Sequence, residues 1–410
     1  MQVPLNRLFF AADEIAHVTQ AIASGEITSE GFFTKQCSRL LEEGFGIDKV
    51  LITPSCTSAL EIAAMLCDLE PGDEVILPSF TFVSTANCFV RLGARPMFVD
   101  IREDTLNIDE RLVEKAITPR TRAIFPVHYG GVSCNMDRLM QLAGDYNLMV
   151  VEDAAQGIGA SFRGRALGSI GHLGAFSFHS TKNVSCGEGG ALCINSPDLV
   201  ERAEIIREKG TNRSKFLRGE IDKYTWVDVG SSHVPSEILC AFLFAQLEGL
   251  GQIGNRRREV FHFYQSCLRC YEDQGLFRLP IVPQGSDTNY HIYYILLNDV
   301  ITRDAFMAHL NRTGISAVSH YVPLHSSPMG KRFGYREGDL PVTEDLSQRL
   351  VRLPIFPSMT EEEQAYVVNQ ISLFFSRHKD RRTKVSNLVG ASSRLIVMSD
   401  QLNALFDPLV

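Results

Sequence analysis

The sequence predicts an α/β fold: a mainly parallel seven-stranded sheet with a smaller α+β domain toward the C-terminus. Short apolar, β-branched runs alternate with segments of helical periodicity in the first half of the chain, a pattern typical of a doubly wound sheet with helices on both faces. VLIT and MVVE are apolar almost without a break, as in strands buried on both sides. After about residue 195 the alternation stops, and 410 residues are enough for a second domain.

Seven runs account for the predicted strands. In chain order they are KVLITP (49–54), DEVILP (73–78), RPMFVD (95–100), RAIFPV (122–127), LMVVED (148–153), GAFSFH (174–179) and GALCIN (190–195). Helical patterns lie between them, for example SALEIAAMLCDL and MDRLMQLAGDY. We therefore expect a large domain over residues 1–245.

The second half of the chain predicts a small domain over residues 246–378. A long helical stretch beginning at Ser236 is expected to bridge into it. The domain would contain a strand at 291–297 and a helix that ends at Gly314. Residues 379–410 form an extension to which the sequence assigns no chemistry.

Composition narrows the classes of function. The formal net charge of −8 and pI of about 5.8 argue against a nucleic-acid-binding protein. No signal peptide or membrane span is recognisable, so we expect a cytoplasmic protein. The only C-x-x-C pair, Cys267 and Cys270, lies in a helical pattern with no second pair to complete a zinc site. No metal is therefore predicted.

Polar side chains stand where the predicted strands end, the edge at which ligands bind in open α/β sheets. The first strand leads into SCTSAL (55–60), whose hydroxyls and helix N-terminus suit a phosphate. The fifth ends at Asp153, with Gln156 three residues later, and the sixth leads to Ser177 and Lys182. Taken singly, each has a simpler interpretation: a helix cap, a structural acid, and a solvated lysine beside a turn.

Taken together, these groups are the set that pyridoxal 5′-phosphate (PLP) requires. Its aldehyde bonds to a lysine, its pyridine nitrogen takes an acid partner, and its phosphate needs an anion site. The aromatic stretch PSFTFVSTAN, with Phe80 and Phe82, could flank the ring. Burial would lower the pKa of the lysine and make it a better nucleophile.

The order of SCTSAL, PSFTFVSTAN, VHYGG, VEDAAQ, FSFHSTKN and GEGGAL resembles the DegT/DnrJ/EryC1/StrS family of sugar aminotransferases. Members are aspartate-aminotransferase-like, fold type I PLP enzymes that act on nucleotide-linked keto sugars. The resemblance covers residues 4 to about 376. It implies that Lys182 bonds to the cofactor and that Asp153 pairs with the pyridine nitrogen.

Further roles follow from the same resemblance. Gln156 would contact the ring hydroxyl, Phe82 would stack on the ring, and the phosphate would be held by Thr57, Ser58 and Ser177. Ser232 would reach the phosphate in the partner of a homodimer, although the family often has asparagine there. His233 replaces an aromatic residue, and Cys56 stands where the family often has glycine.

The resemblance is strongest to a branch that uses L-glutamate and a dTDP-linked 4-keto sugar. Lys209 and Arg213 are candidates for the diphosphate or else solvated surface charges, and His320, Tyr321 and His325 in HYVPLH are candidates for the substrate side. A different sugar, a 3-keto substrate or the other epimer stays open. A catalytically silent regulator and a Rossmann dehydrogenase are disfavoured, because Asp153, Gln156 and Lys182 are present and a G-x-G-x-x-G turn is not.

Overall fold

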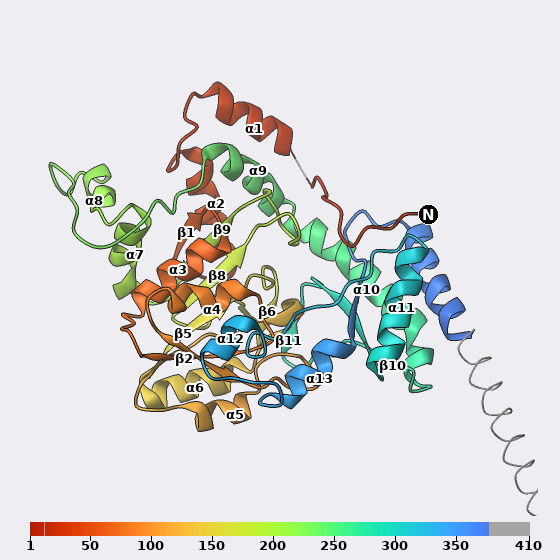
Figure 1. Cartoon of the computed structure of the whole chain (residues 1–410). Helices are drawn as coiled ribbons and strands as arrows, with labels where there is room; N and C mark the ends of the chain where they lie inside the picture. Colours follow the sequence, from red (N-terminus) through yellow and green to blue (C-terminus); the bar gives the residue numbers. More distant parts are fainter. Residues whose placement is uncertain (12, 377–410) are drawn as a thin grey trace, which may run out of the picture.

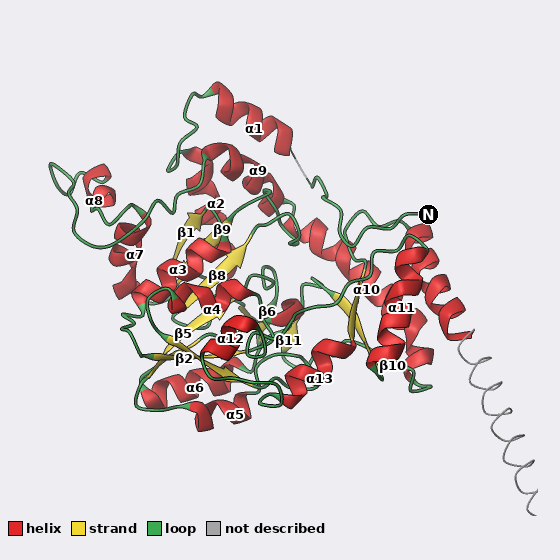
Figure 2. Ribbon diagram, viewed as in Figure 1, coloured by secondary structure: helices red, strands yellow, loops and turns green. Residues whose placement is uncertain are grey.

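The computed structural model describes residues 1–11 and 13–376. All seven predicted strands form one sheet (Figures 1 and 2), in the order β1-β9-β8-β5-β4-β2-β3. Their bounds are β1 Lys49–Thr53, β2 Glu74–Pro78, β3 Arg95–Val99, β4 Thr121–Ile124, β5 Met149–Asp153, β8 Leu173–Ser177 and β9 Gly190–Ile194. Strands β3, β2, β4, β5 and β8 are parallel, whereas β9 runs antiparallel to both β8 and β1. The prediction of a mainly parallel seven-stranded sheet is confirmed.

Helices cover both faces of this sheet. One face packs against α2 (Phe32–Phe45), α5 (Glu110–Ala116), α6 (Met136–Tyr146) and α9 (Glu237–Glu248), and the other against α3 (Cys56–Leu66), α4 (Val83–Val90) and α7 (Val200–Arg207). Phe176 and Phe178 lie in the first core and Ala175 in the second. Strand alternation therefore turns Ser177 toward the α3 and α4 side. Helices α1 (Glu14–Ala23) and α8 (Arg213–Leu217) lie at the periphery (Figure 1).

The helical stretch after Ser236 is interrupted. Helix α9 ends at Glu248, and α10 (Leu250–Glu272) begins after Gly249. A Cβ on Gly249 would lie 2.2 Å from the Cβ of Ala11. The N-terminal segment therefore crosses the chain here, and the glycine permits this close approach.

A third hydrophobic core lies beyond this interruption, on the right in Figure 1. It packs α10 and α11 (Val300–Arg312) on an antiparallel sheet of β10 (Phe277–Arg278), β12 (Tyr293–Leu297) and β13 (Leu350–Leu353). The predicted strand at 291–297 and the helix before Gly314 thus both form. Helices α12 (Pro328–Arg332) and α13 (Pro341–Arg349) follow, and a small sheet joins β6 (Ser161–Phe162), β7 (Arg165–Ala166) and β11 (Ser286–Asp287). The extension at 379–410 lies outside the described residues.

Cys267 and Cys270 are both unpaired residues of α10. Over residues 1–11 and 13–376, no group of three or more His, Cys, Asp or Glu side chains is placed to hold a metal ion. The same residues include no helix with the length and apolar character that a membrane crossing needs.

Candidate active site

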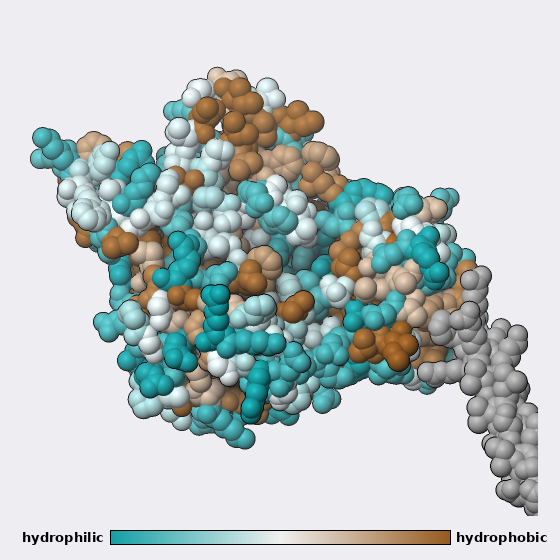
Figure 3. All heavy atoms as spheres, in the orientation of Figure 1, coloured by the Kyte–Doolittle hydropathy of each residue, from teal (hydrophilic) through white to brown (hydrophobic). Residues whose placement is uncertain are grey.

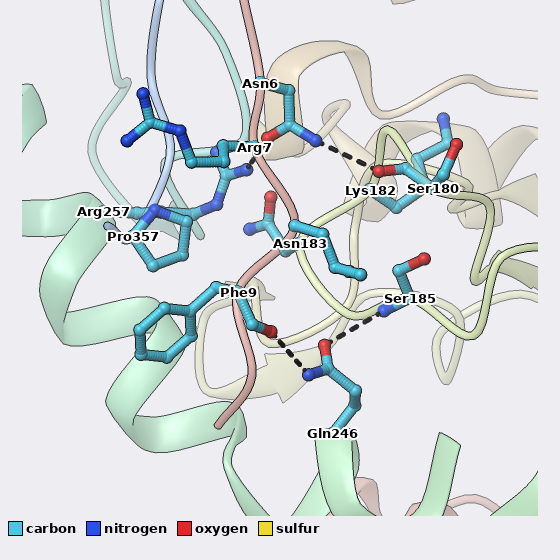
Figure 4. Close-up of a pocket in the computed structure, with 11 residues that line it drawn as sticks. Asn6, Arg7, Phe9, Ser180, Lys182, Asn183, Ser185, Gln246, Arg257 and Pro357 are labelled. Atoms are coloured by element: carbon cyan, nitrogen blue, oxygen red, sulfur yellow. Dashed lines mark hydrogen bonds between the residues drawn. The ribbon is translucent and has the colours of Figure 1, made fainter. Parts of the chain in front are cut away.

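Lys182 lies in the loop between β8 and β9. Phe178 and Gly189 close this loop with a backbone hydrogen bond of 2.8 Å, and the amide of Lys182 donates to the carbonyl of His179 at 2.9 Å. Asn6 donates to the Ser180 carbonyl at 3.0 Å on one flank (Figure 4). The loop is therefore fixed by contacts within itself and by the N-terminal segment.

Gln246 of α9 holds the other flank of the loop. Its Oε1 accepts from the amide of Ser185 at 3.4 Å, and its Nε2 donates to the carbonyl of Phe9 at 2.7 Å (Figure 4). Residues 6–9, the loop and α9 thus meet around a small pocket whose lining includes Lys182. Nothing in the sequence pattern around Asn6 or Gln246 indicates a contact with a distant loop, so neither residue could be predicted from it.

The amine of Lys182 has no hydrogen-bond or ion-pair partner among the described residues. Burial lowers its pKa. Cys56 and Asp153 oppose this shift, while the positive charge of Arg352 adds to it. A larger share of the amine is therefore unprotonated at neutral pH than for a solvated lysine, and an unprotonated amine can act as nucleophile or base.

Asp153 ends β5 and is 5% exposed. Its Oδ2 accepts a hydrogen bond of 2.7 Å from the hydroxyl of Thr85, and its Oδ1 accepts one of 3.1 Å from the amide of Ala155. The Thr85 hydroxyl is also 2.8 Å from that of Thr81. Two donors thus fix the orientation of the carboxylate. Thr85 lies within PSFTFVSTAN, but its contact with Asp153 depends on how α4 packs on the sheet and could not be predicted from the sequence.

Gln156 connects three segments. Its Oε1 accepts from the amide of Gly130 at 2.7 Å, and its Nε2 donates to the hydroxyl of Tyr321 at 3.0 Å. Gly130 belongs to the 3₁₀ turn Tyr129–Gly131 after β4, and Tyr321 to the HYVPLH segment of the C-terminal half. The side chain of Gln156 therefore joins the two halves of the chain beside Asp153.

The N-terminus of α3 is open to an anion. Ser55 caps the helix by accepting from the amide of Ser58 at 3.1 Å, whereas the amides of Cys56 and Thr57 have no acceptor among the described residues. The Thr57 hydroxyl is 2.8 Å from that of Ser84. Free amides at the start of an 11-residue helix favour a negative group.

Ser177 is brought to this helix end by β9. Gly190, the first residue of β9, pairs with Ser177 of β8 on one side and with Thr53 of β1 on the other. A Cβ on Gly190 would lie 2.3 Å from the amide nitrogen of Cys56. The missing side chain lets the strand approach the turn, so the hydroxyls at 57, 58 and 177 gather at one edge of the sheet.

These groups fit PLP. An unpartnered amine of lowered pKa matches its aldehyde, a hydrogen-bonded carboxylate matches its pyridine nitrogen, and the open helix end matches its phosphate. Phe82 directly precedes α4, with 57% of its surface exposed and its ring centroid 6.5 Å from that of Tyr321.

The other predicted substrate residues fall into two groups. His320 is half-buried, with Nδ1 3.1 Å from the hydroxyl of Tyr129 and Nε2 accepting from Arg352 at 3.4 Å. His325 is fully buried, and its ring nitrogens lie 2.7 Å from Ser79 Oγ and 2.8 Å from Glu344 Oε1.

Lys209, Arg213 and Ser232 belong to the segment that follows α7 and includes α8, two helices on the left in Figure 1. Both cations lie 3.4 Å from the buried carboxylate of Glu208, and Ser232 pairs with Glu208 in a β-bridge. Among the described residues, no hydrogen bond or ion pair joins these three side chains to Lys182 or Asp153.

Comparison with known proteins agrees with this geometry. The family model of the DegT/DnrJ/EryC1/StrS aminotransferase family matches residues 10–372. The spore coat polysaccharide biosynthesis protein SpsC of Bacillus subtilis is 33% identical over 377 residues, which cover 90% of this chain and 96% of SpsC.

Solved structures share the fold. The aminotransferase TlmJ from Streptoalloteichus hindustanus superposes with a TM-score of 0.84 at 28% identity, covering 92% of this chain and 100% of that one. The PLP form of the sugar aminotransferase Spr1654 from Streptococcus pneumoniae superposes with a TM-score of 0.83 at 25% identity, covering 92% and 99%. The prediction of a fold type I, PLP-dependent protein is confirmed, and the chain belongs to the DegT/DnrJ/EryC1/StrS aminotransferase family.

Proposed function

We propose that this protein is a dTDP-4-amino-4,6-dideoxygalactose transaminase. It would transfer the amino group of L-glutamate to the 4-keto group of dTDP-4-dehydro-6-deoxy-D-glucose, giving dTDP-4-amino-4,6-dideoxy-D-galactose and 2-oxoglutarate. The sugar assignment is supported by TPSCTSALEIAA, DKYTWVDVGSSH and HYVPLHSSP, which resemble that enzyme of enterobacterial common antigen synthesis. Similarity to SpsC, a polysaccharide biosynthesis protein, is consistent with a role in surface polysaccharide formation.

The observation that carries the proposal is the unpartnered amine of Lys182, near both Asp153 and the open end of α3. When bound, PLP supplies an electron sink for the pair left as a substrate C–H bond breaks. We propose that Asp153 holds the pyridine nitrogen and Gln156 the ring hydroxyl. Phe82 would cover the ring, and Thr57, Ser58 and Ser177 would bind the phosphate.

Lys182 would also carry the protons of the reaction. Its amine takes the proton from Cα of glutamate in the first half-reaction and delivers one to C4 of the sugar in the second. A lowered pKa suits both tasks, because the amine must accept and release a proton near neutral pH. The face of the sugar that receives this proton decides between the galacto and gluco epimers.

We further propose a homodimer with shared sites. Ile15 and Ile22 of α1 expose 76% and 57% of their surfaces, and α1 carries the brown apolar surface at the top of Figure 3. Trp226 and Val229, near Ser232, expose 77% and 65%. Apolar surface of this kind favours burial against a second copy. Ser232, Lys209 and Arg213 would then contribute to the partner's site, which would explain why no hydrogen bond or ion pair joins them to Lys182 among the described residues of one chain.

We also propose roles for the two domains and for the HYVPLH segment. Residues 1–245 and 246–378 would act as large and small domains that carry the cofactor site and its closing side. His320 and Tyr321 would face the substrate, whereas His325, whose ring nitrogens are both occupied, would position that segment. The alternative function is a related nucleotide-sugar aminotransferase that differs in sugar, in keto position (C3) or in product epimer.

The first test concerns the lysine. Borohydride should fix PLP to the wild-type protein at Lys182, detected by peptide mass spectrometry, and Lys182→Ala should abolish this adduct. Lys49→Ala is a matched control, because that lysine is half-buried but paired with Glu42. An adduct that survives Lys182→Ala would overturn the central assignment.

The second test concerns the substrate. The holoenzyme is incubated with L-glutamate and a panel of 4-keto and 3-keto sugar nucleotides, and NMR of the products gives position and epimer. The proposal expects an axial 4-amino group on the dTDP-linked sugar. Amination only at C3, only of another nucleotide sugar, or with gluco stereochemistry would select the alternative.

A further inference from the structure

Arg352 occupies an unusual position in β13. Its neighbours Val351 and Leu353 lie in the core around α10 and α11, whereas Leu350 lies in a cluster with Phe80 and Tyr129. Strand alternation therefore turns Arg352 toward that second cluster. The aromatic residues there are in contact with Tyr321, the hydrogen-bond partner of Gln156. Arg352 thus points from the C-terminal half of the chain toward the candidate active site.

The positive charge of Arg352 is not compensated. No carboxylate among the described residues forms an ion pair with it, and its buried Nε has no hydrogen-bond partner. Its side-chain partner is the imidazole of His320, 3.4 Å from Nη1. Arg349, three residues earlier, instead pairs with Asp345 and donates to the carbonyl of Leu297. Arg352 is half-buried, and its Nε is withdrawn from water with neither an acceptor nor a nearby anion. A buried donor of a charged group that lacks a partner is costly, so its retention indicates a use.

His320 orients the guanidinium without neutralising it. Burial lowers the pKa of His320 to about 2, and the positive charges of Arg352 and Lys182 add to this shift. The ring is therefore uncharged. Its Nε2 accepts from Arg352, so Nδ1 carries the proton and donates to the hydroxyl of Tyr129, 3.1 Å away. Arg352 thereby keeps a full positive charge and free donors in a fixed direction.

Another buried arginine, Arg257, does not share this property. It also lacks a carboxylate, but its guanidinium donates to the carbonyls of Tyr290, His291 and Ile355 and to Asn6 Oδ1. Three of these acceptors share Nη1 and the fourth is bound by Nη2, while Nε lacks a partner, as in Arg352. Arg257 is a structural cross-link, whereas Arg352 retains donors for a ligand.

The anion that fits Arg352 follows from the reaction, and this step rests on the proposed function. In an amino acid the carboxylate is bonded to Cα, the atom from which Lys182 must take a proton. In the sugar nucleotide the diphosphate is on C1, across the ring from the reacting C4. An anion site close to Lys182 therefore suits the first substrate. Arg352 meets this condition, because its positive charge acts on the amine of Lys182, and its partner His320 directly precedes Tyr321, which bonds to Gln156.

We propose that Arg352 binds the α-carboxylate of the amino donor, and of the 2-oxo acid product, through a two-pronged guanidinium–carboxylate contact. Such pairs are short, directional and stronger than neutral hydrogen bonds. The contact would select α-amino acids over other amines and orient the Cα–H bond toward Lys182. It would also supply the counter-charge that the free protein lacks at this position.

The test compares Arg352→Gln and Arg352→Lys with the matched control Arg349→Gln. Calorimetric titration of each holoenzyme with 2-oxoglutarate should show affinity about 10- to 100-fold weaker for Arg352→Gln, the loss expected for a charged hydrogen-bonded pair. Arg352→Lys keeps the charge but cannot make the two-pronged contact. Its affinity for 2-oxoglutarate should therefore lie between those of the wild type and Arg352→Gln. Arg349→Gln should bind 2-oxoglutarate as the wild type does, and titration with the dTDP-keto sugar should be unchanged in all three.

A second readout identifies the carboxylate. In the glutamate half-reaction, followed by absorbance without any sugar, wild type should strongly prefer L-glutamate to 4-aminobutanoate, which lacks the α-carboxylate. Arg352→Gln should lose at least tenfold of that preference. Because the substitution removes an uncompensated charge, the ligand-free variant should unfold thermally no earlier than wild type, which separates loss of binding from loss of folding.

Two results would overturn the inference: unchanged 2-oxoglutarate affinity and donor preference in Arg352→Gln, or a loss that falls on the sugar nucleotide instead. The proposed function fails separately. If wild type reacts with glutamate through Arg352 but aminates no dTDP-linked keto sugar, the sugar assignment is wrong and the carboxylate site stands.

Discussion

Ser79→Ala tests how the HYVPLH segment is held on the large sheet. Ser79 follows β2 and is fully buried, and its hydroxyl accepts from the amide of His325 at 3.0 Å. The hydroxyl proton is therefore directed to Nδ1 of His325, 2.7 Å away. Nε2 then carries the ring proton and donates to Glu344 at 2.8 Å. One hydroxyl thus satisfies two buried groups of a residue 246 positions away in sequence.

The magnitude follows from those two bonds. Alanine leaves the amide and Nδ1 of His325 without partners in a site closed to water, at about 1–3 kcal/mol each. The expected loss in the free energy of unfolding is therefore about 2–6 kcal/mol. The backbone bond from Leu324 to the Ser79 carbonyl, 3.0 Å long, is retained and gives no further loss.

Equilibrium urea unfolding measures this loss. Ser326→Ala is the matched control, because its half-buried hydroxyl makes one 3.3 Å bond to the carbonyl of Pro323 and its removal should cost less than about 1 kcal/mol. If Ser79→Ala is as stable as this control, the segment is held by other contacts. The argument that His325 positions Tyr321 would then be refuted.

Three further outcomes are expected. Gly190→Ala should weaken PLP affinity more than tenfold in an absorbance titration, because its Cβ would lie 2.3 Å from the backbone nitrogen of Cys56. Burial raises the pKa of Glu152, but its hydrogen bonds outweigh burial and lower this pKa overall. The ionised carboxylate therefore stabilises the fold above the unfolded pKa of about 4.3, and this stabilisation is lost as pH falls through the lower, folded pKa. Glu152→Gln should flatten the loss of stability between about pH 5 and 3, measured by thermal unfolding. Thr85→Val removes a 2.7 Å bond to Asp153 and should slow the glutamate half-reaction about tenfold in stopped-flow absorbance.

Each of these has a control on the same chain. Gly44→Ala lies in α2 with no atom within 4 Å of its new Cβ and should leave PLP binding unchanged. Glu43→Gln removes an exposed carboxylate paired with Arg39. This variant should lose stability between about pH 5 and 3 as the wild type does. Thr19→Val removes an exposed hydroxyl far from the sheet and should not change the half-reaction. Equal behaviour of a variant and its control would contradict the corresponding argument.

The central sheet could be predicted because its strands are buried on both faces and therefore read as apolar runs between helical patterns. The ends of those strands predicted Asp153, Ser177 and Lys182, since Asp153 and Ser177 lie in the last residues of such runs and Lys182 follows one by three residues. The break at Gly249 was not predicted. It depends on Ala11 crossing from more than two hundred residues away, and a glycine in a helical pattern is otherwise compatible with one continuous helix.

Arg352 and Thr85 show why the rest of the candidate site could not be predicted. Each lies in an ordinary pattern, one on a short strand and one in a helix, and neither stands at the end of a large-sheet strand. Arg352 contacts His320 and Thr85 contacts Asp153, and these contacts form only when the elements pack together. Sequence periodicity indicates which face is buried but not which distant polar group shares it.

The position of β9 also has a consequence for synthesis of the chain. Of the seven strands of this sheet, β1 leaves the ribosome first, yet its sheet partner is β9, more than a hundred residues later. The apolar segment KVLIT therefore has no sheet partner until Gly190–Ile194 has emerged, and unpaired strands of this kind are prone to aggregate. Nascent chains that stop before residue 190 should thus depend on chaperones. Those that extend past Ile194 can close the sheet, and in the same step bring Gly190 against the turn at Cys56.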